Sequence, residues 1–186
     1  MGEIKKIKLN GILLDNYKTN SKLSILIPLI LFISFMFANF YYAVQAVEIG
    51  VKHNVGQLFL SMAIFSVFDY LMLVLLLWVY RSILSIRPYF YLVGKTLFNE
   101  KFKLCYIVKN MVLGAIMFLC FKMPYLEVFL PVISIILSYL VVIFTYKTLE
   151  PKIDIMFRHM FFKLLLFPWF IYQIGELLLN LLLGGY

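Results

Sequence analysis

Residues 57–80 constrain the fold more than any other part of the sequence. This stretch of 24 residues contains one charged side chain, Asp69, and a basic segment follows it from Arg81 onward. A helix of that length is about 36 Å long, so it can cross a hydrocarbon core of about 30 Å with some tilt. Asp69 would lie about 18 Å along the helix from Gln57, beyond the reach of either aqueous face. We therefore predict a transmembrane helix that holds a carboxyl group near the middle of the membrane.

The composition extends this interpretation to the whole chain. Hydrophobic residues make up 64% of the 186 residues and charged residues 14%, whereas soluble domains average about 45–50% and about 25%. These values exclude a soluble domain. Since a chain of this length usually forms one domain, we expect an all-α, multi-pass membrane protein with a single membrane domain over residues 1–186.

Four more apolar segments have the character of membrane spans. Residues 23–47 are 25 uncharged residues, more than the core of a cleavable signal peptide contains, and Pro28 is expected to kink this helix near its start. The third span is the weakest, because only residues 110–121 are free of charge and they would cover about 18 Å. The five predicted spans cover about residues 23–47, 57–80, 104–123, 128–146 and 164–183.

Basic segments with amphipathic spacing flank these spans. Residues 1–22, 81–103 and 150–163 are expected to lie in the headgroup layer, in part as short interfacial amphipathic helices. Basic side chains there would be attracted to anionic lipid by about 1 kcal/mol each. The expected contacts with lipid headgroups or with a partner are made by Arg81, Arg87, Lys95, Lys101, Lys103, Lys152, Arg158 and Lys163.

The distribution of basic residues predicts the orientation of the chain. With five spans and the N-terminus inside, 15 of the 17 Lys and Arg residues lie on the inner face, and only Lys52 and Lys122 lie outside. If residues 104–123 did not cross, the split would be 12 against 5. Five crossings therefore agree better with the positive-inside rule. The expected location is the cytoplasmic membrane of a bacterium or an organelle membrane, with anionic headgroups at the inner face.

Polar side chains on the last span share one helical face and are expected to meet Asp69. Trp169, Gln173, Glu176 and Asn180 follow one another at intervals of 4, 3 and 4 residues. Glu176 would lie about 20 Å from the inner face, at nearly the depth of Asp69. We predict an intramembrane polar site made of Asp69, Glu176, Gln173, Asn180, Asn39, Ser66, Ser134 and Ser138, with Lys109 as a further partner if it bends inward.

Three roles are open for the two carboxyl groups. In the first, both are protonated and hydrogen-bond helices to one another. In the second, one or both meet a cation or a polar group on a partner subunit. In the third, they bind and release ions along a proton or cation pathway.

Catalysis, metal binding and cofactors are not expected. The sequence contains no Gly-rich phosphate loop and no HExxH, and His53 and His159 are predicted on opposite faces of the membrane. Cys105 and Cys120 would be about 22 Å apart along one helix, too far to pair.

The excess of basic residues, which gives a net charge of +8, follows the membrane spans, so nucleic acid is not an expected partner. The sequence therefore favours a non-catalytic integral membrane subunit or interaction partner within a multi-protein complex, or a homo-oligomer. The alternative is a small proton- or cation-coupled transporter or channel component that uses the intramembrane carboxylates.

Overall fold

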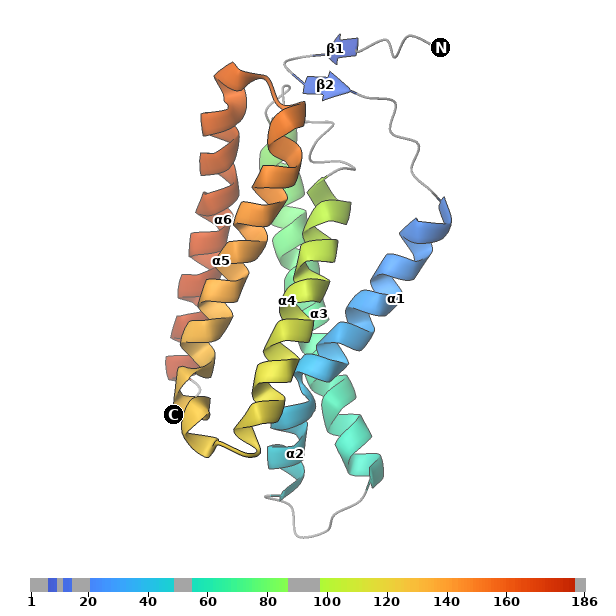
Figure 1. Ribbon diagram of the computed structural model, residues 1–186, viewed down its shortest axis with the longest axis vertical. Coiled ribbons are helices and arrows are strands. Elements are labelled where there is room, and N and C mark those ends of the chain that lie inside the picture. The colour runs from blue at the N-terminus through green and yellow to red at the C-terminus, as the bar shows by residue number, and fades with distance from the viewer. Residues whose placement is uncertain (1–6, 10–11, 15–20, 49–54, 87–97, 183–186) are drawn as a thin grey trace. The chain divides into compact units, whose positions relative to one another are not determined.

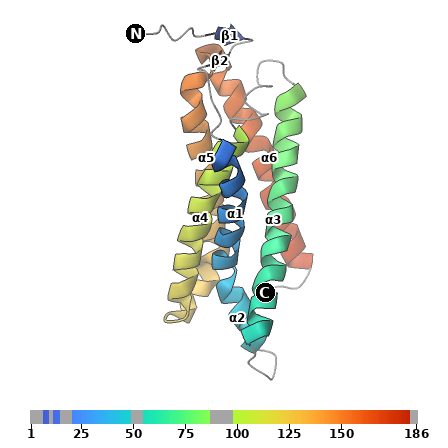
Figure 2. The same ribbon diagram turned by 90° about the vertical axis from the view of Figure 1, so that its right-hand side faces the viewer.

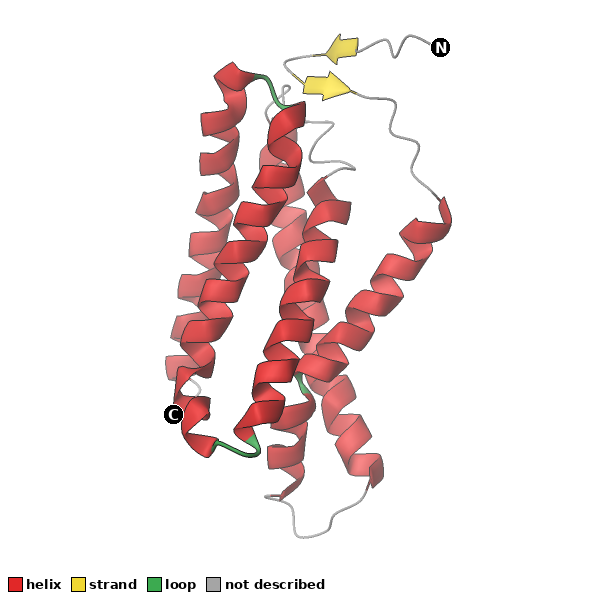
Figure 3. Cartoon of the chain, in the orientation of Figure 1, coloured by secondary structure: helices red, strands yellow, loops and turns green. Residues whose placement is uncertain are grey.

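The computed structural model describes the backbone of residues 7–9, 12–14, 21–48, 55–86 and 98–182. Within these ranges, the side chains of residues 7–9, 12–14, 21–25, 46, 48, 152, 176, 177 and 179–182 lie outside the description. Apart from one short hairpin and the turns between elements, the described chain is helical (Figure 3).

The described chain contains six α-helices, two 3-10 helices and two short strands (Figure 1). It divides into two compact units. The first comprises Met1–Thr19, Leu76–Phe102 and Val142–Tyr186, and the second comprises Asn20–Leu75 and Lys103–Val141. The α-helices are α1 (Ser21–Ala38), α2 (Phe40–Glu48), α3 (Val55–Ile86), α4 (Phe98–Cys120), α5 (Leu130–Leu149) and α6 (Ile155–Leu182), and the 3-10 helices are η3 (Pro124–Phe129) and η4 (Glu150–Lys152).

Four helices in the described part of the chain are long and apolar enough to cross a membrane. They cover Val55–Ile86, Phe98–Cys120, Pro124–Leu149 and Ile155–Gly175, and their mean hydropathy lies between 1.3 and 2.6. Large apolar side chains point outward along them, which is the arrangement that lipid favours. The prediction of a helical, multi-pass membrane protein is therefore confirmed in this coarser form, and the fifth span stays a prediction.

The first predicted span forms two helices that are interrupted at Asn39. A shorter apolar helix covers Leu26–Ala38, and Pro28 lies inside α1. The Asn39 amide N–H donates to the Phe35 carbonyl oxygen (2.9 Å), and the Asn39 carbonyl accepts from the Ala43 amide (3.0 Å). Backbone bonds thus continue across the interruption at Asn39. The kink near Pro28 stays a prediction.

For residues 1–22 we predicted an amphipathic segment with helical spacing. This prediction is wrong for residues 7–9 and 12–14, the part that the structure describes. β1 (Ile7–Leu9) and β2 (Ile12–Leu14) form an antiparallel hairpin in which Leu9 pairs with Ile12. The sequence between them is Asn-Gly, the pair that two-residue hairpin connections prefer. This local signal outweighs the loose helical spacing. β2 lies beside η4, which is part of the connection between α5 and α6 (Figure 1).

Two predicted interfacial segments continue the membrane helices instead of forming separate helices. Residues 155–163 are the first turns of α6, because no Pro or Gly between Ile155 and Lys163 interrupts backbone hydrogen bonding. α3 likewise continues through Arg81 to Ile86. The part of the predicted segment at 87–97 lies outside the described residues.

Aromatic packing holds the first unit together. The Tyr80 ring of α3 lies 4.9 Å from Phe98 and 5.5 Å from Phe102 of α4, measured between ring centroids. The Tyr80 hydroxyl donates a hydrogen bond to the Leu165 carbonyl oxygen of α6 at 2.8 Å. One buried Tyr therefore links three helices and has its only polar atom satisfied, as an apolar environment requires.

In the second unit, α1 lies between α3 and α4 in the view of Figure 2. A small residue permits close contact between α1 and α4: a Cβ placed on Gly114 would overlap the Phe37 ring and lie 3.1 Å from the Phe37 carbonyl oxygen. Small residues of this kind allow membrane helices to approach closely. An apolar core formed by Tyr41, Leu113, Met117, Cys120 and Leu130 adjoins this contact.

We expect Gly114→Ala to lower the free energy of unfolding by about 1–3 kcal/mol, because the added methyl group must displace Phe37 or separate the helices. Gly175→Ala is the matched control, since nothing lies within 4 Å of the corresponding Cβ position and Ala favours helix. Unfolding of both variants by sodium dodecyl sulfate in mixed micelles measures the difference. Equal stability of the two variants would contradict the close contact.

Candidate functional site

In the second unit, Asp69 of α3 is bonded to a polar side chain at the junction of α1 and α2. The Asn39 side-chain amide donates a hydrogen bond to the Asp69 carboxylate, with 2.7 Å between Nδ2 and Oδ2. Asn39 is 8% exposed, and Asp69 is half-buried. A carboxyl group in apolar surroundings requires such a partner. The bond therefore joins α3 to the point where α1 and α2 are interrupted.

A buried cation lies in the same region. Lys109 of α4 is 9% exposed, and it attracts the Asp69 carboxylate electrostatically. Its Nζ atom donates to the Tyr106 hydroxyl at 3.2 Å and lies 4.4 Å from the centre of the Tyr106 ring. These contacts replace part of the water that an ammonium group loses on burial. Lys109 thus bends inward and gives Asp69 a counter-charge from the same chain.

Aromatic rings pack against one another on the helices that carry Asp69 and Lys109. The Phe35 ring lies 5.7 Å from Tyr106 and 6.4 Å from Tyr70, and Phe32 lies 6.3 Å from Tyr70, all between ring centroids. The rings come from α1, α3 and α4, the helices that carry the polar groups. They lower the local dielectric constant, which strengthens the hydrogen bond and the electrostatic attraction inside the cluster.

A second hydrogen bond joins α4 to α1 among residues that the sequence analysis did not select. The Asn110 amide donates to the Ser34 hydroxyl oxygen at 3.1 Å, and that hydroxyl donates to the Leu31 carbonyl at 2.7 Å. Asn110 and Ser34 are both buried. The signal available in the sequence was the position of Asn110 beside Lys109, where the short uncharged run of the third span begins.

Another polar contact that the sequence analysis missed connects α2 to η3. The Glu127 carboxylate accepts hydrogen bonds from the Tyr41 hydroxyl (3.2 Å) and from the Gln45 side-chain amide (3.1 Å). Gln45 also donates to the Tyr41 hydroxyl oxygen at 3.0 Å. This carboxylate is half-buried and has two donors, so it fixes the end of α2 against the turn that precedes α5.

Three predicted serines do not join the cluster. The Ser66 hydroxyl donates to the Met62 carbonyl of its own helix at 2.6 Å, a common way to satisfy Ser inside a membrane helix. Ser138 is buried and Ser134 is half-buried on α5. Among the described residues, no hydrogen bond connects Asp69 to any of these serines.

The predicted polar face of the last span lies in the first unit. Gln173 and Trp169 are buried there, on a continuous helix that also carries Glu176 and Asn180. The side chains of Glu176 and Asn180 lie outside the description. The predicted proximity of Asp69 to Glu176 therefore stays a prediction.

The predicted headgroup contacts that the structure describes lie in the last turns of α3 and in the first turns of α4 and α6. Arg81 and Lys163 are exposed, and Lys101, Lys103 and Arg158 are half-buried. Arg87 and Lys95, like the side chain of Lys152, lie outside the description. Within the described parts of the chain, no three His, Cys, Asp or Glu side chains are close enough to hold a metal ion.

No family model matches the chain, and neither a curated protein nor a solved structure is significantly similar to it. The chemistry of the site therefore follows from the residues alone. The cluster offers one carboxyl group, one ammonium group and an amide that bridges helices. It can hold three helices together, or it can gain and lose a proton.

We expect Asn39→Ala and Asp69→Ala to be coupled by about 0.6 kcal/mol or more in a double-mutant cycle, within the range for hydrogen bonds between membrane helices. The pair Asn39→Ala and Ser66→Ala is the control, because Ser66 is one turn from Asp69 but is bonded to its own backbone. The free energies come from unfolding in mixed micelles. Additive effects for Asn39 and Asp69 would contradict a direct bond.

Proposed function

We propose that this chain is a non-catalytic integral membrane subunit or interaction partner within a multi-protein membrane complex. What supports the proposal is the pairing of buried polar groups inside one chain, Asn39 with Asp69 and Asn110 with Ser34. These bonds stabilise a fixed arrangement of α1, α3 and α4, which is what a subunit needs to present a constant surface to other proteins.

The proposal includes five crossings, with the N-terminus inside and the C-terminus outside. α1, Asn39 and α2 together cover 28 residues, about 42 Å of helix, and this length suits a single crossing with Asn39 inside it. This arrangement would put 15 of the 17 Lys and Arg residues on the inner face, which is the distribution that the positive-inside rule favours. A bacterial plasma membrane or an organelle membrane is the proposed location.

Because Asp69 has partners within its own chain, we expect another subunit to contact a different part of the protein. Asn39 and Lys109 supply a hydrogen bond and a counter-charge from within the chain, so Asp69 does not need a cation from another subunit. We therefore place the partner contact on outward-facing side chains such as Phe59, Phe68 and Leu71 of α3, which are all exposed. Contacts of this kind between membrane helices depend on packing.

A specific observation favours the second candidate, a proton- or cation-coupled transporter or channel component. Lys109 is buried and attracts Asp69, so gain of a proton by the carboxyl group would weaken this attraction. A pair of ionisable side chains buried in a membrane protein is a recurrent means of binding and releasing charge. In this mechanism Asp69 binds the proton or cation and Lys109 competes for the carboxylate.

Native extraction and reconstitution distinguish the two functions. In mild detergent we expect the tagged chain to run above its own mass of 21.9 kDa with a distinct second polypeptide, and we expect Asp69→Asn to retain that polypeptide because the amide still bonds Asn39. In liposomes, we expect no flux driven by a pH gradient.

Glu127→Gln is the matched control, because it removes a carboxylate of the same unit outside the Asp69 cluster. A homo-oligomer with acid-sensitive flux that is lost in Asp69→Asn and kept in Glu127→Gln would contradict the subunit proposal and establish the transporter.

A further inference from the structure

The first unit contains an open pocket of about 370 Å³ where the end of α5 meets the start of α6. Its polar rim is formed by Lys147, Arg158 and His159. Its remaining wall is formed by Ile143, Tyr146, Ile155 and Phe162. The sequence places Arg158 in the headgroup layer, but it reveals neither the pocket nor the roles of Lys147 and His159.

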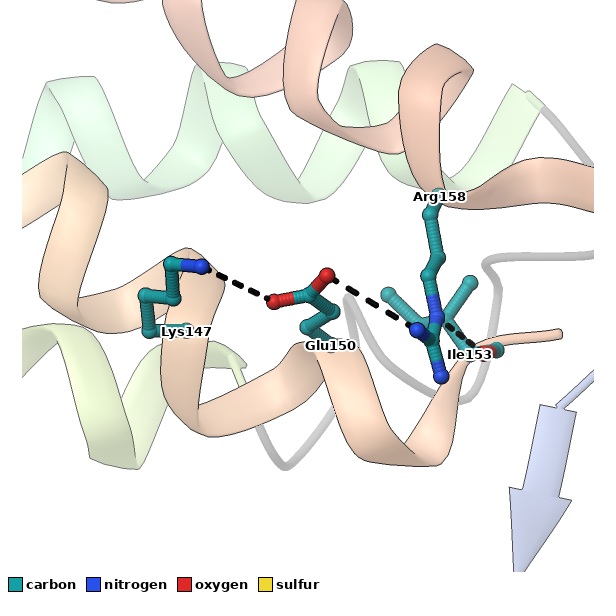
Figure 4. Close-up of polar contacts among 4 residues, drawn as sticks. All are labelled: Lys147, Glu150, Ile153 and Arg158. Atoms are coloured by element: carbon teal, nitrogen blue, oxygen red, sulfur yellow. Dashed lines mark hydrogen bonds and ion pairs between the residues drawn. The ribbon is translucent and has the colours of Figure 1, made fainter. Parts of the chain in front are cut away.

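Glu150 holds the two basic side chains on either side of itself, as Figure 4 shows. Its carboxylate oxygens lie 3.5 Å from Lys147 Nζ and 3.7 Å from Arg158 Nη1. The Arg158 Nε–H donates to the Ile153 carbonyl oxygen at 3.2 Å. The guanidinium group is therefore oriented by two separate contacts before any ligand arrives, which reduces the entropy lost on binding.

The guanidinium group still has donors for an anion. Arg carries five N–H groups in a fixed planar arrangement, and the described contacts of Arg158 use two of them. Glu150 balances one of the two positive charges, so Lys147 and Arg158 leave the rim with an excess of one positive charge. Guanidinium groups bind phosphate oxygens through paired hydrogen bonds, and the His159 imidazole can add another donor.

The apolar wall indicates that the phosphate comes with a hydrocarbon chain. Tyr146 and Phe162 pack with 4.9 Å between ring centroids, beside the two isoleucines of the pocket. α5 and α6 are both long and apolar enough to cross a membrane, and in a membrane this wall would face acyl chains. Cationic pockets between membrane helices that have an apolar wall suit phospholipid headgroups better than free phosphate.

We propose that this pocket binds the phosphate group of an anionic phospholipid. Arg158 makes the paired contact with the phosphate oxygens, and Lys147 contributes its charge from the rim. One acyl chain lies against Ile143, Ile155 and Phe162. This inference does not depend on the function proposed above, because a subunit and a transporter would both expose the pocket to the same membrane.

The test is lipid binding to the full-length protein in a neutral detergent, with trace amounts of phosphatidylglycerol or phosphatidylcholine and bound lipid counted by native mass spectrometry. We expect the wild-type protein to retain phosphatidylglycerol selectively. Arg158→Gln should lower this retention about tenfold or more, since hydrogen bonds to charged groups are strong. Lys147→Gln, whose side chain is 66% exposed and contributes little to folding, should lower it by a smaller factor.

Lys163→Gln is the matched control, because it removes one positive charge from an exposed position of the same helix outside the pocket. An equal loss in Lys163→Gln and Arg158→Gln would overturn the proposal in favour of diffuse attraction to the surface. Equal retention of the two lipids by the wild type would also overturn it. Displacement of the lipid by millimolar inorganic phosphate would identify a site for free phosphate instead.

Discussion

The second unit depends on the hydrogen bond between Asn39 and Asp69. In the middle of an apolar helix, a carboxyl group without a partner opposes insertion and destabilises the fold. Asn39 provides that partner at the one position where the first helical segment is interrupted, and Lys109 adds charge of the opposite sign from α4. One acidic residue therefore determines which faces of α1, α3 and α4 turn toward one another.

The remaining contacts of this unit act together with that bond. Gly114 allows α4 to approach Phe37, which brings Lys109 and Asn110 close to α1. Rings from all three helices also pack against one another, and apolar packing of this kind lowers the local dielectric constant. The close contact at Gly114 thus brings Lys109 near α1. The polar cluster of Asn39, Asp69 and Lys109 in turn stabilises this arrangement of the helices.

The sequence predicted the four helices that are long and apolar enough to cross a membrane, because uncharged runs of sufficient length have few alternatives in lipid. It also indicated Asn39 and Asp69, since polar residues within apolar runs are conspicuous.

The sequence did not reveal that Ser34 and Asn110 bond to one another, or that Ser66 bonds to its own backbone. Both facts depend on how the helices are rotated, which apolar periodicity leaves undefined when all sides of a helix are apolar. The hairpin over Ile7–Leu9 and Ile12–Leu14 does not follow from apolar spacing, because its signal is the local Asn-Gly pair between the strands.

The most direct measurement of the central claim is cross-linking between positions 39 and 69. Asn39→Cys and Asp69→Cys are combined in a chain whose Cys105 and Cys120 are replaced by Ser, and a short fluorogenic reagent that bridges two thiols is added in native membranes. The account predicts fluorescent product at the mass of a single chain, and none when Val67→Cys, on the exposed side of α3, replaces Asp69→Cys. Product only between two chains, or equal product at positions 67 and 69, would contradict it.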